Sequence, residues 1–352
     1  MLIFVIILLL IIFNEISAKG KNEFFDDYCA RRQTSAINGI FTILIFLSHA
    51  SQYVILSGPL DDPYITLKKH LGQLVVVTFL FFSGFGIMES INKKGTDYVK
   101  SIPKNRLFKV WYHFALAVVL YIIIGEVFNK DYDLKRILLS FTGWSSIGNS
   151  SWFMLVTFAM YIIIFLSFIL VRRSRVLAVI LVTLLTGAFA LFEYKMGLAS
   201  RYYNTIMCFP AGMIYSLIKP YTDKILMKND TIWACAFALF FGGYCLFTTM
   251  RDNRILYHII WCFLAMALIL MFSMKVQIAN SILDWFGSHI FSIYILQRIP
   301  MIILYQMGYA NHKYFFIIAS FVLTVAIASV FDLITDKLDS LIFKSPKKLK
   351  SN

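Results

Sequence analysis

The sequence predicts an all-α fold, a polytopic transmembrane helical bundle with about 10–11 membrane-spanning helices. The first observation is composition, because 59% of the 352 residues are hydrophobic and 15% are charged, whereas roughly a quarter of a soluble domain is charged. The second is a mean hydropathy of +0.74, with apolar runs long enough to cross a bilayer along the whole chain. We therefore expect a multi-pass protein of the cell membrane, in contact with membrane lipid.

The apolar runs define the expected spans. Residues 2–13 form a short run without the basic start or the A-x-A-type site of a signal peptide, so we expect an uncleaved, short N-terminal span. A polar segment, residues 14–35, separates it from a second run that begins at Ala36. Further runs lie at roughly 71–91, 110–128, 152–171, 176–194, 202–218, 231–249, 255–274, 288–308 and 314–334.

Lysine and arginine counts in alternate loops predict the orientation. The loops on one side hold 22 of these residues and those on the other hold 10, and the richer side is cytoplasmic by the positive-inside rule. We therefore expect Lys100, Lys347 and the C-terminus in the cytoplasm and Lys135 outside. The same rule explains the net charge of +14, because the sequence contains no basic soluble domain that would bind nucleic acid. The five cysteines show no CxxC pair and no metal-ligand spacing, so we expect neither a disulfide framework nor a metal site.

The second apolar run carries a histidine deep inside it. At 100° per residue Asn38, Thr42, Ile45, His49 and Gln52 share one helical face, and four of these five side chains are polar. His49 therefore points into protein or water, roughly 20 Å from the inner membrane boundary. Two interpretations follow: an imidazole that accepts a proton from a hydroxyl, or a packing histidine that hydrogen-bonds across helices.

Two further segments combine polar and apolar residues. Ser83, in the segment FFSGFG, offers a hydrogen bond beside glycines that let another backbone approach, which is a common packing device in membrane helices. Lys104, Arg106 and Lys109 belong to a basic cluster that follows the same run. Topology and anionic lipid explain such a cluster, and it would also suit the phosphates of a cytoplasmic nucleotide-like donor.

Polar residues recur at the end of a long outer loop and late in the chain. Ser151 and Trp152 close the segment GWSSIGNSSW, which is either an interfacial loop with an aromatic anchor or a place where a sugar hydroxyl docks. Tyr294, Gln297 and Arg298 lie in or beside a late apolar run and require polar partners there.

Together these segments resemble the integral-membrane acyltransferase-3 family, whose members O-acylate envelope polysaccharides and related glycans. NGIFTILIFLSHA is similar to the family's first-helix motif, in which a basic residue precedes a histidine by eleven positions. FFSGFGIMES resembles its FFxxSGF segment, NRL its arginine-bearing cytoplasmic loop, NSSWFM its Trp-Phe helix start and FGSHIFSIYILQR its late Gly-Ser-aliphatic-Tyr-Leu-His motif. We accordingly expect a short N-terminal span and polar linker at 1–35, an acyltransferase-3-like transmembrane domain at 36–335 and a basic cytoplasmic tail at 336–352.

The resemblance implies transfer of an acyl group, with acetyl expected, from cytoplasmic acyl-CoA to a hydroxyl of a cell-envelope polysaccharide or lipid-linked sugar. Acyl-CoA would be a co-substrate, and no bound cofactor is implied. In this scheme His49 is the general base, and Asn38 and Ser83 orient or stabilise the reacting groups. Arg106, Lys104 and Lys109 would bind the donor, and the acceptor site or polar core would comprise Trp152, Ser151, Tyr294, Gln297 and Arg298.

Two positions depart from the family motifs. Asn38 stands where the family has a basic residue, and Gln297 stands where it has a histidine. Arg298 or Arg32 would have to supply the missing charge, and the alternative is an inactive member. A transporter or flippase for a lipid-linked sugar, or an accessory export subunit, also stays open, although the chain shows no repeated half with matching broken helices. The sequence leaves a homo-oligomer open as well.

Overall fold

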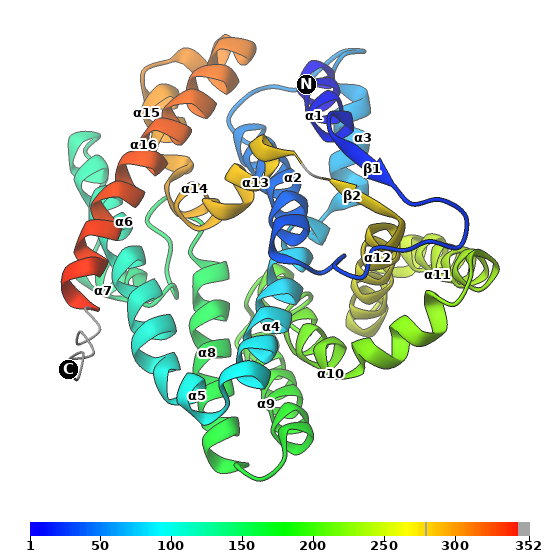
Figure 1. Cartoon of the computed structure of the whole chain (residues 1–352). Helices are drawn as coiled ribbons and strands as arrows, with labels where there is room; N and C mark the ends of the chain where they lie inside the picture. Colours follow the sequence, from blue (N-terminus) through cyan, green and yellow to red (C-terminus); the bar gives the residue numbers. More distant parts are fainter. Residues whose placement is uncertain (279, 344–352) are drawn as a thin grey trace, which may run out of the picture. The chain divides into compact units, whose positions relative to one another are not determined.

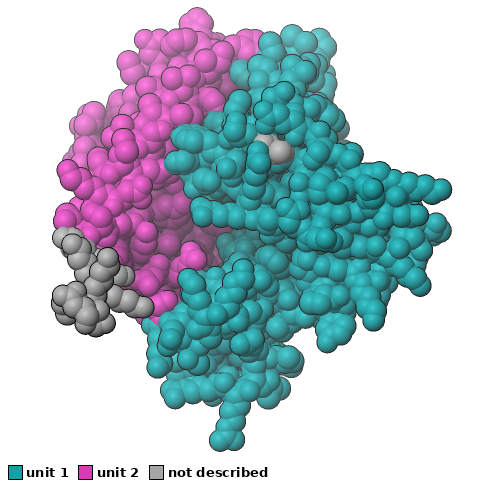
Figure 2. All heavy atoms as spheres, in the orientation of Figure 1, with its two compact units in different colours: residues 1–100, 162–290 teal, residues 101–161, 291–352 magenta. Residues whose placement is uncertain are grey.

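The computed structural model describes residues 1–278 and 280–343, and nearly all of its regular structure is helical (Figure 1). The chain forms two compact units, which Figure 2 colours separately. Unit 1 comprises residues 1–100 and 162–290, and unit 2 comprises residues 101–161 and 291–352. Each unit is therefore built from two separate stretches of the sequence.

Unit 1 contains nine helices that lie wholly within its described residues. They are α1 (Leu2–Phe13), α2 (Arg31–Ala50), α3 (Asp62–Leu71), α4 (Leu74–Lys94), α9 (Arg175–Lys195), α10 (Cys208–Leu226), α11 (Asp230–Met250), α12 (Ile255–Lys275) and α13 (Ser281–Ser288), with a 3₁₀ turn at Ser200–Tyr202. Two short strands, β1 (Ile16–Ala18) and β2 (Val276–Ile278), pair antiparallel.

Unit 2 is built from the remaining helices. They are a π-helical turn, η1 (Pro103–Phe108), α6 (Lys109–Val127), α7 (Leu134–Ser140), α15 (Arg298–Gln306) and α16 (Lys313–Ile342), with a 3₁₀ turn at Tyr309–Asn311. Three helices cross the division between the units, namely α5 (Thr96–Ile102), α8 (Trp152–Leu170) and α14 (Ile290–Leu296).

Seven helices in the described part of the chain are long and apolar enough to cross a membrane, and the broken pair α13 with α14–α15 makes eight if it counts as one span. The all-helical, multi-pass fold is thus confirmed, whereas the expected number of about 10–11 spans is higher than this test of length and composition gives. The difference comes from α2 and α10, whose polar side chains dilute their apolar character, and from α1, which has only 12 residues.

The closest packing in unit 1 joins α2 to α13 through glycines on both helices. A Cβ on Gly39 would lie 2.0 Å from the carbonyl oxygen of Leu283, and one on Gly287 would lie 1.8 Å from that of Ser35. The Ser35 hydroxyl also donates to the Asp284 carbonyl oxygen over 3.0 Å. Small residues thus allow backbone-to-backbone contact between these helices.

Glycines also allow close contact between the backbones of α4 and α10. A Cβ on Gly84 would lie 2.0 Å from the carbonyl oxygen of Phe209, and one on Gly212 would lie 2.0 Å from that of Phe81. Gly86, by contrast, has no atom of another part within 4 Å of the position that its Cβ would take. Of the two glycines in the FFSGFG segment, only Gly84 lies at a close helix contact.

The start of α2 differs from the predicted polar linker. The helix begins at Arg31, five residues before the expected start, and Gln33 is buried within it. The Gln33 side chain donates to the Val276 carbonyl oxygen over 3.2 Å and accepts from the Ile278 amide over 2.8 Å. A polar residue is therefore tolerated in the first buried turn because strand β2 satisfies its amide group.

Candidate functional site

His49 is the penultimate residue of α2. Its side chain is half-buried, and its Nδ1 atom is buried. The helix ends one residue later, where the Gln52 amide donates to the His49 carbonyl oxygen over 3.0 Å. Gln52 is exposed in this turn, so it does not continue the helical stripe that the sequence predicted. The imidazole thus sits at the C-terminal end of a helix that α13 holds in place.

Asn38 lies on the same face of α2 as His49 but does not reach it. Eleven residues separate the two positions, which is roughly 16 Å along a helix axis. The Asn38 carbonyl oxygen accepts from the Thr42 hydroxyl over 2.8 Å. Its side-chain Oδ1 is buried, and no described residue donates to it. The polar face of α2 therefore carries an amide oxygen that is available to accept a hydrogen bond.

A lysine that the sequence did not single out lies at the His49 end of α2. The Lys68 ammonium donates to the Ser51 hydroxyl over 2.7 Å and lies 3.4 Å from the Ser48 carbonyl oxygen. Burial lowers the pKa of Lys68 from its ordinary value. Lys68 belongs to α3, which we predicted as loop, although its start at Asp62-Pro63 is a helix N-terminal signature.

Ser83 is exposed on α4, although its neighbours Phe82 and Gly84 are both buried. No described residue forms a hydrogen bond with its hydroxyl. The side that carries Gly84 packs against α10, so Ser83 does not take part in that helix contact. Its role beside His49 stays a prediction.

Arg32, a candidate for the missing charge, occupies the first turn of α2 and is exposed. Seventeen residues separate it from His49, which is roughly 25 Å along the helix axis. The geometry of α2 therefore places Arg32 at the end opposite His49.

In unit 2, the basic cluster lies on helical segments where a loop was expected. Lys104 and Arg106 are exposed on η1. The Lys104 ammonium lies 5.7 Å from the centre of the Phe343 ring. Lys109 differs, because its ammonium forms an ion pair with the Asp339 carboxylate over 2.5 Å. Lys109 would have to leave this partner to bind a donor phosphate.

Asp339, near the end of α16, gathers three side chains from the first turns of α6. Besides Lys109, the Tyr112 hydroxyl donates to its carboxylate, and Nε2 of His113 lies 3.2 Å from the same oxygen. The sequence did not indicate this cluster, because 226 residues separate His113 from Asp339 and no local motif predicts their contact.

Unit 2 also brings together the residues predicted for the acceptor site or polar core. The Arg298 Nε atom donates to the Ser150 hydroxyl over 2.8 Å. The rings of Phe153 and Tyr294 are 5.3 Å apart, and Trp152 packs edge-on against Phe153 at 5.7 Å. Ser151 is buried at the start of α8. The beginning of α8 therefore packs against α14 and α15. In the sequence, only the polar character of these residues indicated that they require partners.

Gln297 occupies the break between α14 and α15 and is completely buried. Its Nε2 donates to the Tyr294 carbonyl oxygen over 3.2 Å, and its Oε1 has no donor among the described residues. Pro300 explains the break, since it has no N–H to donate to the Leu296 carbonyl oxygen. The late span predicted at roughly 288–308 therefore corresponds to α14 and α15, which are interrupted at Gln297.

These features define a polytopic membrane protein whose helices carry an imidazole and buried amides, with a cationic helical segment before α6. A family model described as an acyltransferase domain matches residues 36–333. The chain therefore belongs to the acyltransferase-3 family and is a membrane acyltransferase. No curated protein and no solved structure matches it. Within residues 1–278 and 280–343, no group of three or more His, Cys, Asp or Glu is placed to hold a metal ion.

Proposed function

We propose that this acyltransferase moves an acyl group, with acetyl expected, from cytoplasmic acyl-CoA to a hydroxyl of a cell-envelope polysaccharide or lipid-linked sugar. The observation that carries the proposal is the half-buried imidazole of His49 at the end of α2, in a chain of a family that transfers acyl groups. Acyl transfer to a hydroxyl requires a base, and imidazole is the side chain that titrates near neutral pH.

The proposed reaction is a direct transfer in which His49 handles the proton. The imidazole takes the proton of the acceptor hydroxyl as the oxygen attacks the thioester carbonyl carbon. The carbon–oxygen bond forms, the carbon–sulfur bond breaks, and the imidazolium returns the proton to the departing thiolate of CoA. Asn38 and Ser83 are proposed to orient the reacting groups, and Lys68 adds a positive charge at the His49 end of α2.

Donor binding is assigned to the cluster around η1. The exposed side chains of Lys104 and Arg106 support this assignment, because a donor phosphate can reach them, and Arg and Lys are the usual phosphate partners. Lys109 is the third cation of the proposed donor site, and its partner Asp339 competes with the donor for it. The proposed acceptor site or polar core comprises Trp152, Ser151, Tyr294, Gln297 and Arg298.

The test that separates catalysis from packing compares two variants of His49. His49→Ala is expected to lower turnover by at least about 10²-fold while the protein still folds. His49→Gln keeps size and hydrogen bonding but has no basicity, so it should be as inactive as His49→Ala. The measurement is acyl transfer by purified variants supplied with donor and glycan, normalised to folded protein by thermal melting in detergent. Near-normal turnover of His49→Gln would remove His49 from the mechanism and would favour an inactive or non-enzymatic member.

The donor site is tested at Arg106. Arg106→Ala should raise the apparent KM for acyl-CoA by the equivalent of about 1–3 kcal/mol, because it removes a charge-assisted contact. Lys135→Ala is the matched control, since Lys135 is an exposed cation on α7 and is predicted to face the outside. Equal donor kinetics in the two variants would assign the basic cluster to membrane topology alone.

A further inference from the structure

Arg251 lies in the turn between α11 and α12, and its guanidinium is bound to the end of α3. The Nη1 atom donates to the His70 carbonyl oxygen over 2.7 Å, and the Nη2 atom donates to that of Lys69 over 2.6 Å. These are two of the carbonyl groups that the end of a helix leaves without intrahelical donors. The guanidinium suits this pair of acceptors, because its N–H groups form a planar, fixed fork.

An aromatic ring also holds the guanidinium. The Arg251 Cζ atom lies over the Trp261 ring, 4.1 Å from its centre, and Trp261 is completely buried. The Trp261 indole donates to the Thr248 hydroxyl over 2.9 Å, which ties the ring to α11. The Asp252 carboxylate is exposed and lies 3.9 Å from the Arg251 Nε atom. The two carbonyl groups and the ring therefore fix the Arg251 side chain more firmly than this ion pair does.

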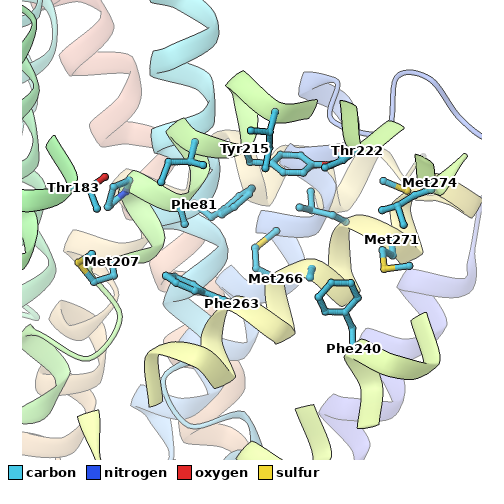
Figure 3. A pocket seen from close by; sticks show the side chains of 17 residues that line it. Phe81, Thr183, Met207, Tyr215, Thr222, Phe240, Phe263, Met266, Met271 and Met274 are labelled. Carbon is cyan, nitrogen blue, oxygen red and sulfur yellow. The ribbon is translucent and has the colours of Figure 1, made fainter. Parts of the chain in front are cut away.

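The helices α11 and α12 form a hairpin that does not close along α10. Figure 3 shows Tyr215 of α10 on one side of an apolar groove and Phe240 and Phe263 of the hairpin on the other. The turn that connects α11 to α12 instead reaches α3 through Arg251. The hairpin is therefore attached to the rest of unit 1 in part through this turn.

The last turn of α3 carries Lys68, directly before the two residues whose carbonyl groups Arg251 binds. The Lys68 ammonium donates to the Ser51 hydroxyl over 2.7 Å, at the His49 end of α2. The helix has only 10 residues, and a helix of this length is marginal without tertiary contacts. The position of Lys68 therefore depends on the contacts that hold the end of α3.

We propose that Arg251 is a positioning residue for acyl transfer, which fixes the last turn of α3 and thereby the Lys68 ammonium at the His49 end of α2. This inference rests on the proposed function, in which His49 takes the hydroxyl proton and Lys68 adds positive charge beside it. Arg251 acts through α3 and does not contact the substrates. Its charge is permanent, because a guanidinium is not deprotonated in proteins.

Turnover measurements test whether Arg251 acts through Lys68. Lys68→Met should lower kcat by about 10²-fold, and Arg251→Gln should lower it by about tenfold with an unchanged KM for acyl-CoA. The double variant should be no slower than Lys68→Met, because the loss of Arg251 has no further effect once the ammonium is gone. Arg254→Gln is the matched control and should turn over like the wild type, since Arg254 is an exposed cation at the end of the same turn.

Amine labelling of the full-length protein in detergent reports the position of Lys68 without any acyl transfer. An N-hydroxysuccinimide ester should modify the exposed Lys69 readily and the half-buried Lys68 slowly, and mass spectrometry of the peptides gives the ratio of the two. Arg251→Gln should raise the ratio of Lys68 to Lys69 labelling, because the freed end of α3 exposes the ammonium. Arg254→Gln should leave the ratio unchanged.

Three results would overturn the proposal. Losses that multiply in the double variant would show that Arg251 acts independently of Lys68. Equal turnover of Arg251→Gln and Arg254→Gln would remove Arg251 from the reaction. An unchanged labelling ratio in Arg251→Gln would show that the position of Lys68 does not depend on it.

Failure of the proposed function gives a different result. A wild type without acyl transfer, or near-normal turnover of His49→Gln, would refute that function and the positioning role with it, while the labelling ratio would still show whether Arg251 fixes Lys68. If Arg251→Gln melts below Arg254→Gln, Arg251→Lys takes its place. It keeps the charge but lacks the fork that binds both carbonyl groups, so it should show the same loss of kcat.

Discussion

Replacing Gly39 with alanine should displace the helix that carries His49. The new Cβ would lie 2.0 Å from the carbonyl oxygen of Leu283, 2.8 Å from its carbonyl carbon and 3.0 Å from its Cα. All three atoms belong to the backbone of α13, so no side-chain rotation relieves the overlap. The helices must therefore separate by about 1 Å or more before ordinary van der Waals contact is restored.

The energetic balance has two opposing parts. Overpacking of this kind costs about 1–3 kcal/mol, and rigid backbone on both sides places Gly39→Ala at the upper end. Alanine regains up to about 1 kcal/mol through its higher helix propensity, so we expect a net loss of about 1–2 kcal/mol. Gly86→Ala on α4 is the control, since open space surrounds its Cβ position, and it should be neutral or slightly stabilising.

The assay measures melting temperature in detergent and turnover of the same preparations. Gly39→Ala should lower the melting temperature by several degrees relative to Gly86→Ala and lower turnover by as much as about 10²-fold, because His49 moves with α2. Gly287→Ala strains the same interface from α13, so the double variant should lose less than the sum of the single losses. A Gly39→Ala protein that melts and turns over like the control would refute the reasoning.

Two further predictions concern orientation and the Asp339 cluster. In a cysteine-free background, Lys135→Cys should react with a membrane-impermeant maleimide in intact cells and Lys100→Cys should not, and strong external labelling at position 100 would reverse the topology. Lys347 lies outside the described residues and is predicted to behave like Lys100. Asp339→Asn should cost about 1.5–3 kcal/mol in thermal stability, because the carboxylate binds Lys109, Tyr112 and His113, and an unchanged melting curve would contradict this role.

The membrane class and the helical face that carries His49 could be predicted from sequence for a physical reason, although His49 lies at the end of α2 and not deep inside a span. Apolar runs and helical periodicity are local properties, so they survive without knowledge of the tertiary contacts. The same logic gave the polar stripe on α2, and the structure keeps Asn38, Thr42 and His49 on it. It failed at Gln52, because periodicity does not show where the helix ends.

The contacts that organise the sites could not be predicted in this way. The Gly39 and Leu283 pair that positions α2 joins residues from opposite ends of the sequence, as does the His113 and Asp339 pair. One sequence contains no signal for such pairing beyond the presence of small or polar residues in apolar runs. Pro300 was a local signal for the break at Gln297. Whether the helix breaks there depends on where the carbonyl groups that lose their intrahelical donors find other partners.

Asn38 lacks the positive charge that the family motif has at this position, and the geometry of unit 1 bears on which cation could replace it. A cation at position 38 would stand roughly 16 Å from His49 along α2. It would therefore contact a part of the substrates that is remote from the proton transfer. Arg32 lies still farther away on the same helix. Lys68 instead binds Ser51 and Ser48, on either side of His49 in sequence, from a separate helix. We therefore propose Lys68 as the cation that stabilises negative charge on the attacked carbonyl oxygen, if His49 removes the hydroxyl proton.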